Sequence, residues 1–441
     1  MKKNKFYLAL IIFSLVGQIA WVVENMYFNV FIYKMFNASA DNIALMVQAS
    51  AVAATLTTVF IGALSDKIGK RKIFMCAGYI AWGVSILSFA LVRTDFISSV
   101  FGAAANAASA GITIVIILDC IMTFFGSSAN DAAYNAWLTD NTDETNRGKA
   151  EGLNSMMPLI AILAVFGGFM GFDLERASSW TMIYIIIGAA VLLIGVLGFF
   201  IVEDAPNIKK DDLGYMKTII YGFRPSVVKQ NSKMYFTLAA FVVFGISIQV
   251  FMPYLLIYYE KTLGMSDYVL IMAPAIIVAA VFTALFGKVI DKKGFFGSVA
   301  FPLIALCAGY VLLLVFPGVI NVSGIAMKIP VFIGSLLMMS GYLSGMALFG
   351  AKLRNETPEG MAGRFQGLRI IGQVLIPGVI GPAIGSAVLK DADKVTNSDG
   401  TESFLPSNMI FLASLVVCAV LCAGIAIYCA VKKGRTEREQ K

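Results

Sequence analysis

The chain has 441 residues, of which 59% are hydrophobic and 14% are charged, with 34 lysine and arginine residues against 27 aspartate and glutamate residues. Soluble domains carry about 25% charged residues, so this composition excludes a soluble fold and indicates that most of the chain lies in a bilayer. Histidine is absent from the sequence. Because histidine is the commonest general base and proton switch near neutral pH, we expect any proton chemistry to use carboxylates.

Twelve apolar stretches are long enough for membrane-spanning helices, which need about 20 residues. In chain order, we predict spans over 6–33, 42–64, 73–92, 111–138, 151–171, 180–201, 234–259, 269–287, 298–316, 330–353, 367–389 and 408–431. The first stretch is too long for a signal-peptide core, so we expect it to be retained. The alternating ten-residue strands of an outer-membrane barrel are not seen in the sequence. The predicted fold class is therefore an all-α, multi-pass membrane protein.

The distribution of lysine and arginine predicts the orientation of these spans. With the N-terminus in the cytoplasm, 26 of these residues fall in cytoplasmic segments and seven in outside segments. We therefore expect both termini to be cytoplasmic and the protein to lie in the cytoplasmic (inner or plasma) membrane. The net charge of +7 is then explained by topology, and no nucleic-acid partner is expected. The longest inner loop, 202–233, separates a predicted N-terminal six-helix bundle (1–201) from a C-terminal one (234–441).

The cysteines and one acidic loop show no metal motif. All six cysteines lie in apolar stretches without a CxxC pair, so we expect small core residues and neither disulfides nor metal ligands. The outside loop 390–403, "KDADKVTNSDGTES", does not fit the spacing of a calcium-binding loop. We predict that it is an ordinary hydrophilic loop. No metal or cofactor is expected.

Two polar motifs occur once in each half of the chain. The stretch "TDETNRGKAEGL" (142–153) aligns without gaps with "TPEGMAGRFQGL" (357–368), and "GALSDKIGKRK" (62–72) shares Gly-x-x-x-Asp-x-x-Gly with "GKVIDKKG" (287–294). The two offsets are 215 and 225 residues. Motifs repeated at equivalent loops indicate parallel six-helix repeats, an architecture found in secondary transporters.

The stretch "GALSDKIGKRK", placed directly after the second span, resembles the loop 2–3 signature of the major facilitator superfamily. This resemblance implies two six-helix bundles and a cytoplasmic gate. We assign the gate motif to the following residues: Gly62, Asp66, Gly69, Lys70, Arg71, Arg147, Gly148, Lys149, Gly287, Asp291, Gly294, Gly363 and Arg364. The superfamily places such an aspartate near the N-terminus of helix 11, so Asp66 is expected to meet the helix that begins with "GRFQGL". By symmetry, Asp291 is expected to meet the helix that begins with "GKAEGL". The alternative is that these residues only fix the loops and the topology.

Several polar side chains interrupt the apolar spans, where an ionised group costs about 2.5–3.5 kcal/mol on insertion scales. Spacings of three and four residues group them into faces. The candidate solute-binding residues are Gln18, Trp21, Glu24, Asn25, Asn130, Asp131, Tyr134, Gln249, Tyr254, Arg369 and Gln373. The candidate ion-coupling residues are Glu24, Asp119 and Asp131. The alternatives are helix packing for Trp21, an interhelix hydrogen bond for Asp119 and extension to the inner surface for Arg369.

Within the superfamily, the stretch 130–153 and its later copy resemble the glycoside–pentoside–hexuronide symporters, the melibiose-permease group. That resemblance implies a sugar-binding aspartate near Asn130–Asp131 and a sugar-stacking ring near Tyr134. The paired helix-2 aspartates that bind sodium in that group have no counterpart, because this chain reads Ala54–Thr55–Leu56–Thr57–Thr58. The group's helix-5 arginine is also missing, and Asn154 and Ser155 occupy that region.

The sequence therefore predicts a secondary transporter that works by alternating access, as a monomer, with a sugar, glycoside or similar small polar solute as cargo. Import coupled to H⁺ or Na⁺ is expected, with facilitated diffusion as the alternative. The lipid bilayer is the solvent of the protein. One alternative is export of drugs or amphipathic metabolites, and another is a non-transporting sensor on a transporter scaffold. An enzyme or a primary pump is not expected, because the sequence has no phosphate-binding loop, nucleophile elbow or metal cluster.

Overall fold

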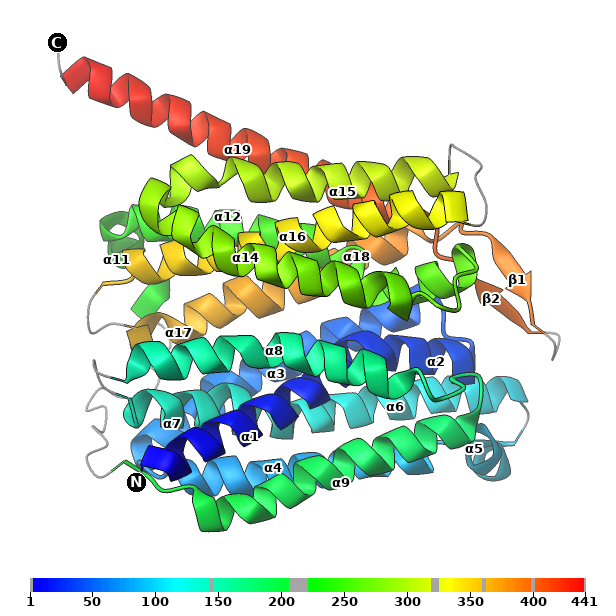
Figure 1. The fold of residues 1–441 in the computed structure, drawn as a ribbon. Helices are drawn as coiled ribbons and strands as arrows, with labels where there is room; N and C mark the ends of the chain where they lie inside the picture. The colour runs from blue at the N-terminus through cyan, green and yellow to red at the C-terminus, as the bar shows by residue number, and fades with distance from the viewer. Residues whose placement is uncertain are drawn as a thin grey trace. The chain divides into compact units, whose positions relative to one another are not determined.

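A computed structural model describes residues 3–102, 104–142, 146–205, 221–318, 325–358, 362–397 and 401–439, apart from the side chains of a few further positions. Nearly all of the described chain is helical (Figure 1). Eleven helices in the described part are long and apolar enough to cross a membrane, and Ala300–Phe316 is a shorter apolar helix of the same kind. Their positions overlap the twelve predicted stretches. The count of twelve spans stays a prediction, because the shorter helix lies at the lower limit of about 17–25 residues.

Large apolar side chains lie on the outside of many of these helices. Phe200 is 75% exposed, Leu91 is 69% exposed and Ile304 is 67% exposed. Such side chains would be unfavourable in water, but in a bilayer the surrounding lipid is as apolar as they are. The helices are thus apolar toward their surroundings, as a multi-pass membrane protein requires.

The chain divides into two compact units, the first formed by Met1–Ile220 with Lys394–Phe404 and the second by Tyr221–Asp393 with Leu405–Lys441. The predicted domain boundaries at residues 201 and 234 stay a prediction, because residues 206–220 lie outside the described part. The elements of the first unit are α1 (Lys3–Val22), η1 (Val23–Tyr27), α2 (Phe28–Phe36), α3 (Ala40–Ile68), α4 (Arg71–Ser88), η2 (Phe89–Leu91), α5 (Thr94–Phe101), α6 (Ala104–Gly126), η3 (Ser127–Tyr134), α7 (Asn135–Asp140), α8 (Arg147–Phe169), α9 (Ala177–Ile201), β1 (Lys394–Thr396) and β2 (Glu402–Phe404).

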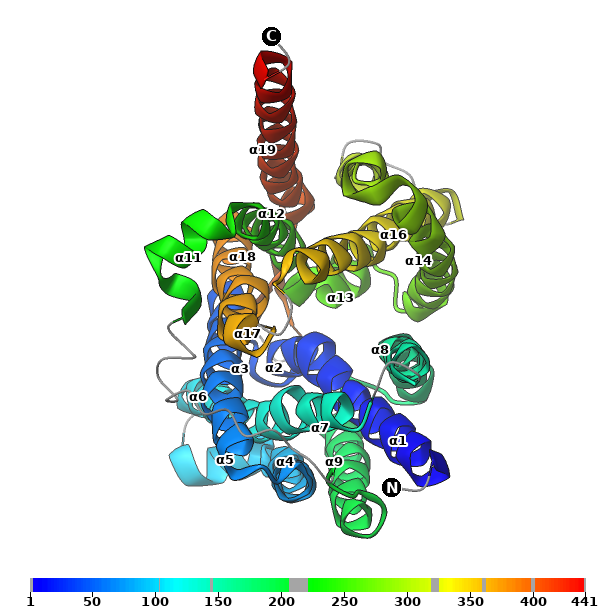
Figure 2. The ribbon, with the colours of Figure 1, turned by 90° about the vertical axis from the view of Figure 1, so that its left-hand side faces the viewer.

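Helices α4 and α9 lie side by side in the first unit (Figure 2). Glycines allow their backbones to touch, because a Cβ atom on Gly83 would lie 2.5 Å from the backbone nitrogen of Leu192. A Cβ atom on Gly195 would lie 2.7 Å from the backbone nitrogen of Ile80. Small residues commonly allow such close helix packing in membranes, where van der Waals contact replaces the hydrophobic effect between helices.

The second unit is also built of helices. Its elements are η4 (Tyr221–Phe223), α11 (Pro225–Gln230), α12 (Ser232–Gln249), η5 (Met252–Tyr254), α13 (Leu255–Ile257), η6 (Tyr258–Thr262), α14 (Val269–Ser298), α15 (Ala300–Gly318), α16 (Ile325–Glu356), α17 (Ala362–Ile370), η7 (Ile371–Leu375), α18 (Ile376–Val388) and α19 (Met409–Glu439). Helix α16 packs against both α14 and α15 (Figures 1 and 2). Helix α14 is interrupted at Gly294, whose φ of 66° favours glycine.

The segment between α18 and α19 differs from the ordinary loop predicted for residues 390–403. Strands β1 and β2 pair antiparallel, with Lys394 opposite Phe404 and Thr396 opposite Glu402. Side-chain hydrogen bonds join the facing ends of the two strands, because the Asn397 amide donates to the hydroxyls of Thr401 at 3.0 Å and Ser403 at 2.8 Å. These local bonds explain why a polar stretch without apolar alternation forms a hairpin.

The hairpin is bound to the end of α2 through Asn37. The Asn37 amide nitrogen donates to the Thr401 hydroxyl at 2.7 Å, and its oxygen accepts from Ser403 at 3.0 Å and from Asn397 at 3.2 Å. The Tyr33 hydroxyl donates to the carbonyl oxygen of Phe404 at 2.7 Å. A segment that connects two helices of the second unit thus belongs structurally to the first unit.

Replacing Asn37 by glycine is expected to loosen the hairpin. Glycine fits the φ of 50° at this position, so the change removes the three side-chain hydrogen bonds without straining the backbone. Each such bond contributes about 0.5–1.5 kcal/mol, so amide hydrogen exchange over 394–404 should become at least about tenfold faster, as measured by mass spectrometry. Glu402→Gln, which removes only the exposed ion pair with Lys394, should change it little. Equal exchange in Asn37→Gly and the parent chain would contradict the role given to Asn37.

Candidate functional site

Glu24 lies in the first membrane span, inside the π-helical segment η1. Such segments are rare and occur often at functional sites. The Glu24 side chain is buried, and its Oε1 atom accepts hydrogen bonds from the hydroxyls of Ser50 and Thr123, each at 2.8 Å. The two hydroxyl oxygens are 2.9 Å apart. Side chains of η1, α3 and α6 therefore meet at one carboxyl group.

Asp119 adds a second buried carboxyl group to this cluster. It lies on α6, one turn before Thr123, is 2% exposed and interacts electrostatically with Glu24. Among the described residues, Oε2 of Glu24 and Oδ1 of Asp119 have no hydrogen-bond partner. Two buried carboxylates without neutralising groups would be strongly unfavourable. A bound proton or small cation at this cluster would reduce that cost.

Asp131 lies near the same cluster. It belongs to the π-helical segment η3, accepts a hydrogen bond from the Ser127 hydroxyl at 2.9 Å and lies within electrostatic range of Glu24. Its side chain is partly exposed, unlike those of Glu24 and Asp119. The three carboxyl groups predicted to couple to an ion thus gather in one region of the first unit.

Asn130 is the centre of a buried polar chain next to the carboxyl cluster. Its amide nitrogen donates to the Tyr79 hydroxyl at 2.7 Å, and its oxygen accepts from the indole nitrogen of Trp21 at 3.2 Å. Tyr79 in turn donates to the carbonyl oxygen of Phe13 at 2.7 Å. The ring of Trp21 packs against that of Trp82, with centroids 5.0 Å apart. Asn130 is therefore engaged by protein groups and holds the ring of Trp21 in place.

Tyr134 belongs to a second polar link in the first unit. Its hydroxyl donates to Oδ1 of Asn154 at 2.8 Å, and the Ser14 hydroxyl donates to the same oxygen at 2.6 Å. Tyr134 is 2% exposed, so its ring faces protein in this conformation. The link connects α1, η3 and α8.

The remaining predicted residues of the first unit lie along the first span. Gln18 is partly exposed, whereas Asn25 is exposed and its amide donates to the backbone oxygen of Trp21 at 2.8 Å. Ser50 and Tyr79 contact the site, but the sequence does not predict them as site residues. Neither has a sequence signal, because Ser50 stands in an alanine-rich stretch and Tyr79 in an apolar one.

The second unit holds four predicted solute-binding residues. Gln249 is partly exposed and lies against Gly381, where a Cβ atom would come within 2.4 Å of the Gln249 side chain. Tyr254 is fully buried, and its hydroxyl lies 3.5 Å from the Pro382 oxygen. Arg369 lies in the last turn of α17 and has a buried Nε atom with no hydrogen-bond partner in the described part of the chain. Gln373 lies in the π-helical segment η7.

Arg71 anchors the part of the first half that was predicted to form a gate motif. This residue is 4% exposed, and its guanidinium donates to Oδ2 of Asp140 at 2.9 Å and to the Ser65 hydroxyl at 2.8 Å. The backbone nitrogen of Lys72 donates to Asp204 at 2.7 Å. The ends of α3, α7 and α9 are thus joined around the start of α4. Gly69 ends α3 with a φ of 71°, a conformation that favours glycine.

The corresponding position of the second half uses different chemistry. With the offset of 225 residues, Phe296 stands where the first half has Arg71. The ammonium of Lys352 lies 5.8 Å from the ring centroids of Phe295 and Phe296 and forms an ion pair with Glu356 at 3.0 Å. A cation–π contact therefore replaces the arginine–aspartate pair.

The other gate residues are placed as follows. Gly62 and Gly287 lie inside α3 and α14, Lys70 and Asp291 are exposed, and Lys149 lies over the ring of Tyr7 at 4.8 Å. The side chains of Asp66, Arg147 and Arg364 lie outside the described part, although their backbones are helical, as are those of Gly148 and Gly363. The docking of Asp66 and Asp291 stays a prediction.

Comparison with protein families matches residues 7–382 to the Major Facilitator Superfamily. This chain belongs to that superfamily. The superfamily is one of membrane transporters for small solutes and not of enzymes, in agreement with the sequence prediction. The match confirms the first resemblance, whereas the narrower resemblance to the melibiose-permease group stays a prediction.

Solved structures of transporters share this fold. A point mutant of the nucleoside transporter NupG superposes with a TM-score of 0.71 at 12% identity and covers 96% of this chain and 99% of its own. A bacterial homologue of the human lysosomal transporter Spinster, inward-facing and unoccupied, superposes with a TM-score of 0.69 at 14% identity and covers 96% of each chain. Identities this low indicate a shared fold alone.

One curated relative is similar in sequence over part of its length. Sugar efflux transporter B of Salmonella typhimurium (strain LT2) is 21% identical over 203 residues, which are 46% of each chain. The match thus spans about half the length of this relative.

Proposed function

We propose that this member of the superfamily is a secondary transporter that moves a sugar, glycoside or similar small polar solute by alternating access. The carboxyl pair Glu24–Asp119 supports the coupled form of this proposal, because two buried carboxyl groups with unpartnered oxygens suit a bound cation. The indole ring of Trp21, which is hydrogen-bonded to Asn130, supplies a flat face for a sugar ring. The partly exposed carboxyl group of Asp131 supplies hydrogen-bond acceptors for sugar hydroxyls.

We propose H⁺ or Na⁺ as the coupling ion and import as the direction. A proton would be held by the two carboxyl groups. Na⁺ would instead be coordinated by carboxylate oxygens and by the hydroxyl oxygens of Ser50 and Thr123. The two ions differ in a simple readout. Solute-driven alkalinisation of the medium indicates H⁺, and a requirement for sodium salts without alkalinisation indicates Na⁺.

Export is a second candidate direction, favoured by the curated relative named as a sugar efflux transporter. In that case the same cluster would bind a cation that moves opposite to the solute. Export of drugs or amphipathic metabolites and a sensor that does not transport remain the further alternatives.

Counterflow in proteoliposomes tests the proposal. The purified chain is reconstituted with unlabelled solute at millimolar concentration inside, and trace labelled solute is added outside, with melibiose, lactose, glucose, glucuronate and uridine as the panel and protein-free liposomes as the control. We expect transient accumulation of at least one carbohydrate. Exchange of a drug panel but of no carbohydrate would overturn the sugar proposal in favour of the drug exporter, and binding without exchange would favour the sensor.

We also propose that the protein lies in the cytoplasmic membrane with both termini inside, and that Asp66 and Asp291 help to close its inner side. The repeated motifs support the gate, because a carboxylate near a helix N-terminus stabilises by about 0.3–2 kcal/mol. Asp66→Asn and Asp291→Asn should each shift spin-label distances across the inner side toward the open state and slow exchange. Unchanged distances and unchanged exchange would refute the gate.

A further inference from the structure

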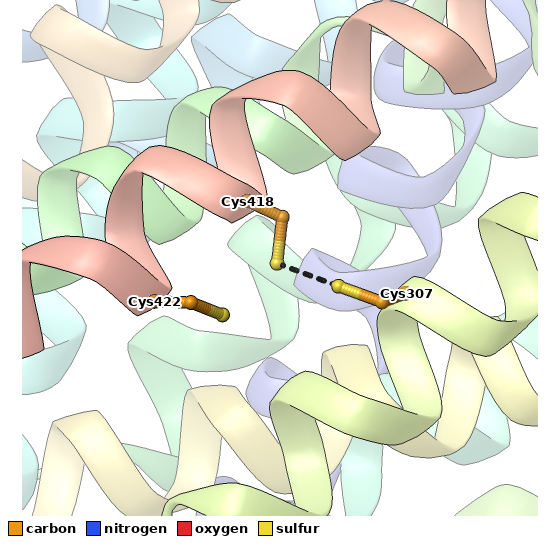
Figure 3. A group of neighbouring side chains, drawn as sticks. All are labelled: Cys307, Cys418 and Cys422. Carbon is orange, nitrogen blue, oxygen red and sulfur yellow. Dashed lines mark hydrogen bonds between the residues drawn. The ribbon is translucent and has the colours of Figure 1, made fainter. Parts of the chain in front are cut away.

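Three of the six cysteines converge at one point of the second unit. Cys307 lies on α15, and Cys418 and Cys422 lie one turn apart on α19, so that both face the same neighbour. The sulfur atoms of Cys307 and Cys418 are 3.4 Å apart, and all three sulfurs lie within 4.8 Å of one another (Figure 3). All three are free thiols. The sequence spacing hides this cluster, because Cys307 and Cys418 are 111 residues apart in the chain.

Packing alone explains a single buried cysteine but does not require three sulfurs at one place. A free cysteine usually behaves as a small hydrophobe, as Cys76 does within α4. Cys418 is fully buried, whereas Cys307 and Cys422 are partly exposed. The cluster therefore combines three soft donors, two of which are partly exposed.

The donor set restricts the ion that would fit. Metal–sulfur bonds are about 2.3 Å long, so an ion centred among three sulfurs needs them about 4 Å apart, within the range of separations that the cluster shows. Thiolates favour soft ions such as Cu(I) and Zn²⁺ over hard ones. Zn²⁺ almost always takes four ligands in structural sites, and within the described residues the cluster contains these three cysteines alone.

Charge also favours a monovalent ion. The cluster lies between two apolar helices, of which Met409–Val431 is long enough to cross a membrane, and uncompensated charge in apolar surroundings is strongly unfavourable. One cysteine that releases its proton neutralises a monovalent cation, and the other two can coordinate as thiols. A divalent cation would require two thiolates at the same place.

We propose that Cys307, Cys418 and Cys422 bind one soft monovalent cation, Cu(I) or its analogue Ag(I), and that the bound ion links α15 to α19. The site is independent of the solute pathway proposed above, because it uses none of the residues assigned to it. Binding is expected to stabilise the second unit against unfolding by holding two helices together through three sulfur–metal bonds.

The test uses the full chain, purified in detergent with a non-thiol reductant under argon. Cu(I) is added in competition with a chromophoric Cu(I) chelator, and the bound metal, the ultraviolet thiolate-to-copper absorption and the thermal midpoint are measured. We expect one Cu(I) per chain, a new ultraviolet band and a raised midpoint. Cys307→Ser and Cys418→Ser should each weaken Cu(I) binding at least tenfold, whereas Cys120→Ser and Cys429→Ser should not.

Two results would overturn the proposal. These are the absence of Cu(I) binding to the reduced parent chain, and equal Cu(I) binding by Cys307→Ser and the parent chain. If substitution of the buried Cys418 prevents folding, Cys422→Ser gives the same comparison, because Cys422 is partly exposed.

Discussion

Replacing Glu24 by glutamine is expected to abolish cation-driven accumulation of the solute while exchange across the membrane continues. Glutamine keeps an oxygen that can accept from Ser50 and Thr123, but it cannot bind a proton or neutralise a cation. One charge moved across 100 mV is worth about 2.3 kcal/mol, or roughly a 50-fold concentration ratio. In proteoliposomes with an imposed potential, the inside-to-outside concentration ratio of the solute should therefore fall from as much as roughly 50 for the parent chain to about one for Glu24→Gln.

Asp119→Asn is expected to act in the same direction, because both carboxyl groups belong to one buried cluster. Asp41→Asn is the matched control, since it removes an exposed carboxylate at the first turn of α3 and should leave accumulation unchanged. Counterflow of labelled solute distinguishes lost coupling from lost folding. If both Glu24→Gln and Asp119→Asn still concentrate the solute, the pair is not the coupling site.

Replacing Arg71 by alanine is expected to cause a large loss of stability. The side chain is 5% exposed and is paired with Asp140, which is 23% exposed. Breaking one partner of a buried pair costs about 3–5 kcal/mol, because the remaining charge is left without compensation. We expect about 3 kcal/mol, since Asp140 retains contact with solvent, measured as the free energy of unfolding in mixed micelles titrated with SDS.

A double-mutant cycle with Asp140→Ala isolates the pair from other effects of truncation. The double variant should lose less than the sum of the single variants. Arg93→Ala is the matched control, because its partner Asp95 forms an exposed pair worth no more than about 1 kcal/mol. Equal losses for Arg71→Ala and Arg93→Ala, or strict additivity in the cycle, would show that the Arg71–Asp140 pair contributes little.

The fold was largely predictable because bilayer-spanning helices are encoded locally. About 20 apolar residues in a row form a helix in lipid, because the backbone groups find no other hydrogen-bond partners there. Each predicted stretch overlaps an apolar helix of the structure. The hairpin at 394–404 was missed, since its stability comes from turn bonds around Asn397 and from Asn37, 360 residues away in the chain. No local sequence pattern predicts such a contact.

The candidate site was predictable only in part. Glu24, Asp119 and Asn130 stood out as polar residues inside apolar spans, where each demands a compensating partner. Their partners Ser50 and Tyr79 carry no such signal, because hydroxyl groups are common in membrane helices and their roles depend on which helix faces them. The resemblance to the melibiose-permease group implies a sugar-stacking ring near Tyr134, whereas in the structure this ring is buried and its hydroxyl donates a hydrogen bond to Asn154.

By itself the sequence determined that this protein spans a membrane, that its two halves repeat the same loop motifs and that its carboxyl groups must carry any proton chemistry, since these properties depend on composition and spacing. Tertiary structure alone decided which side chains meet. The contacts of Glu24 with Ser50 and Thr123, of Arg71 with Asp140 and of Cys307 with Cys418 join separate helices. Such contacts depend on how each helix is rotated and packed, which hydropathy does not encode.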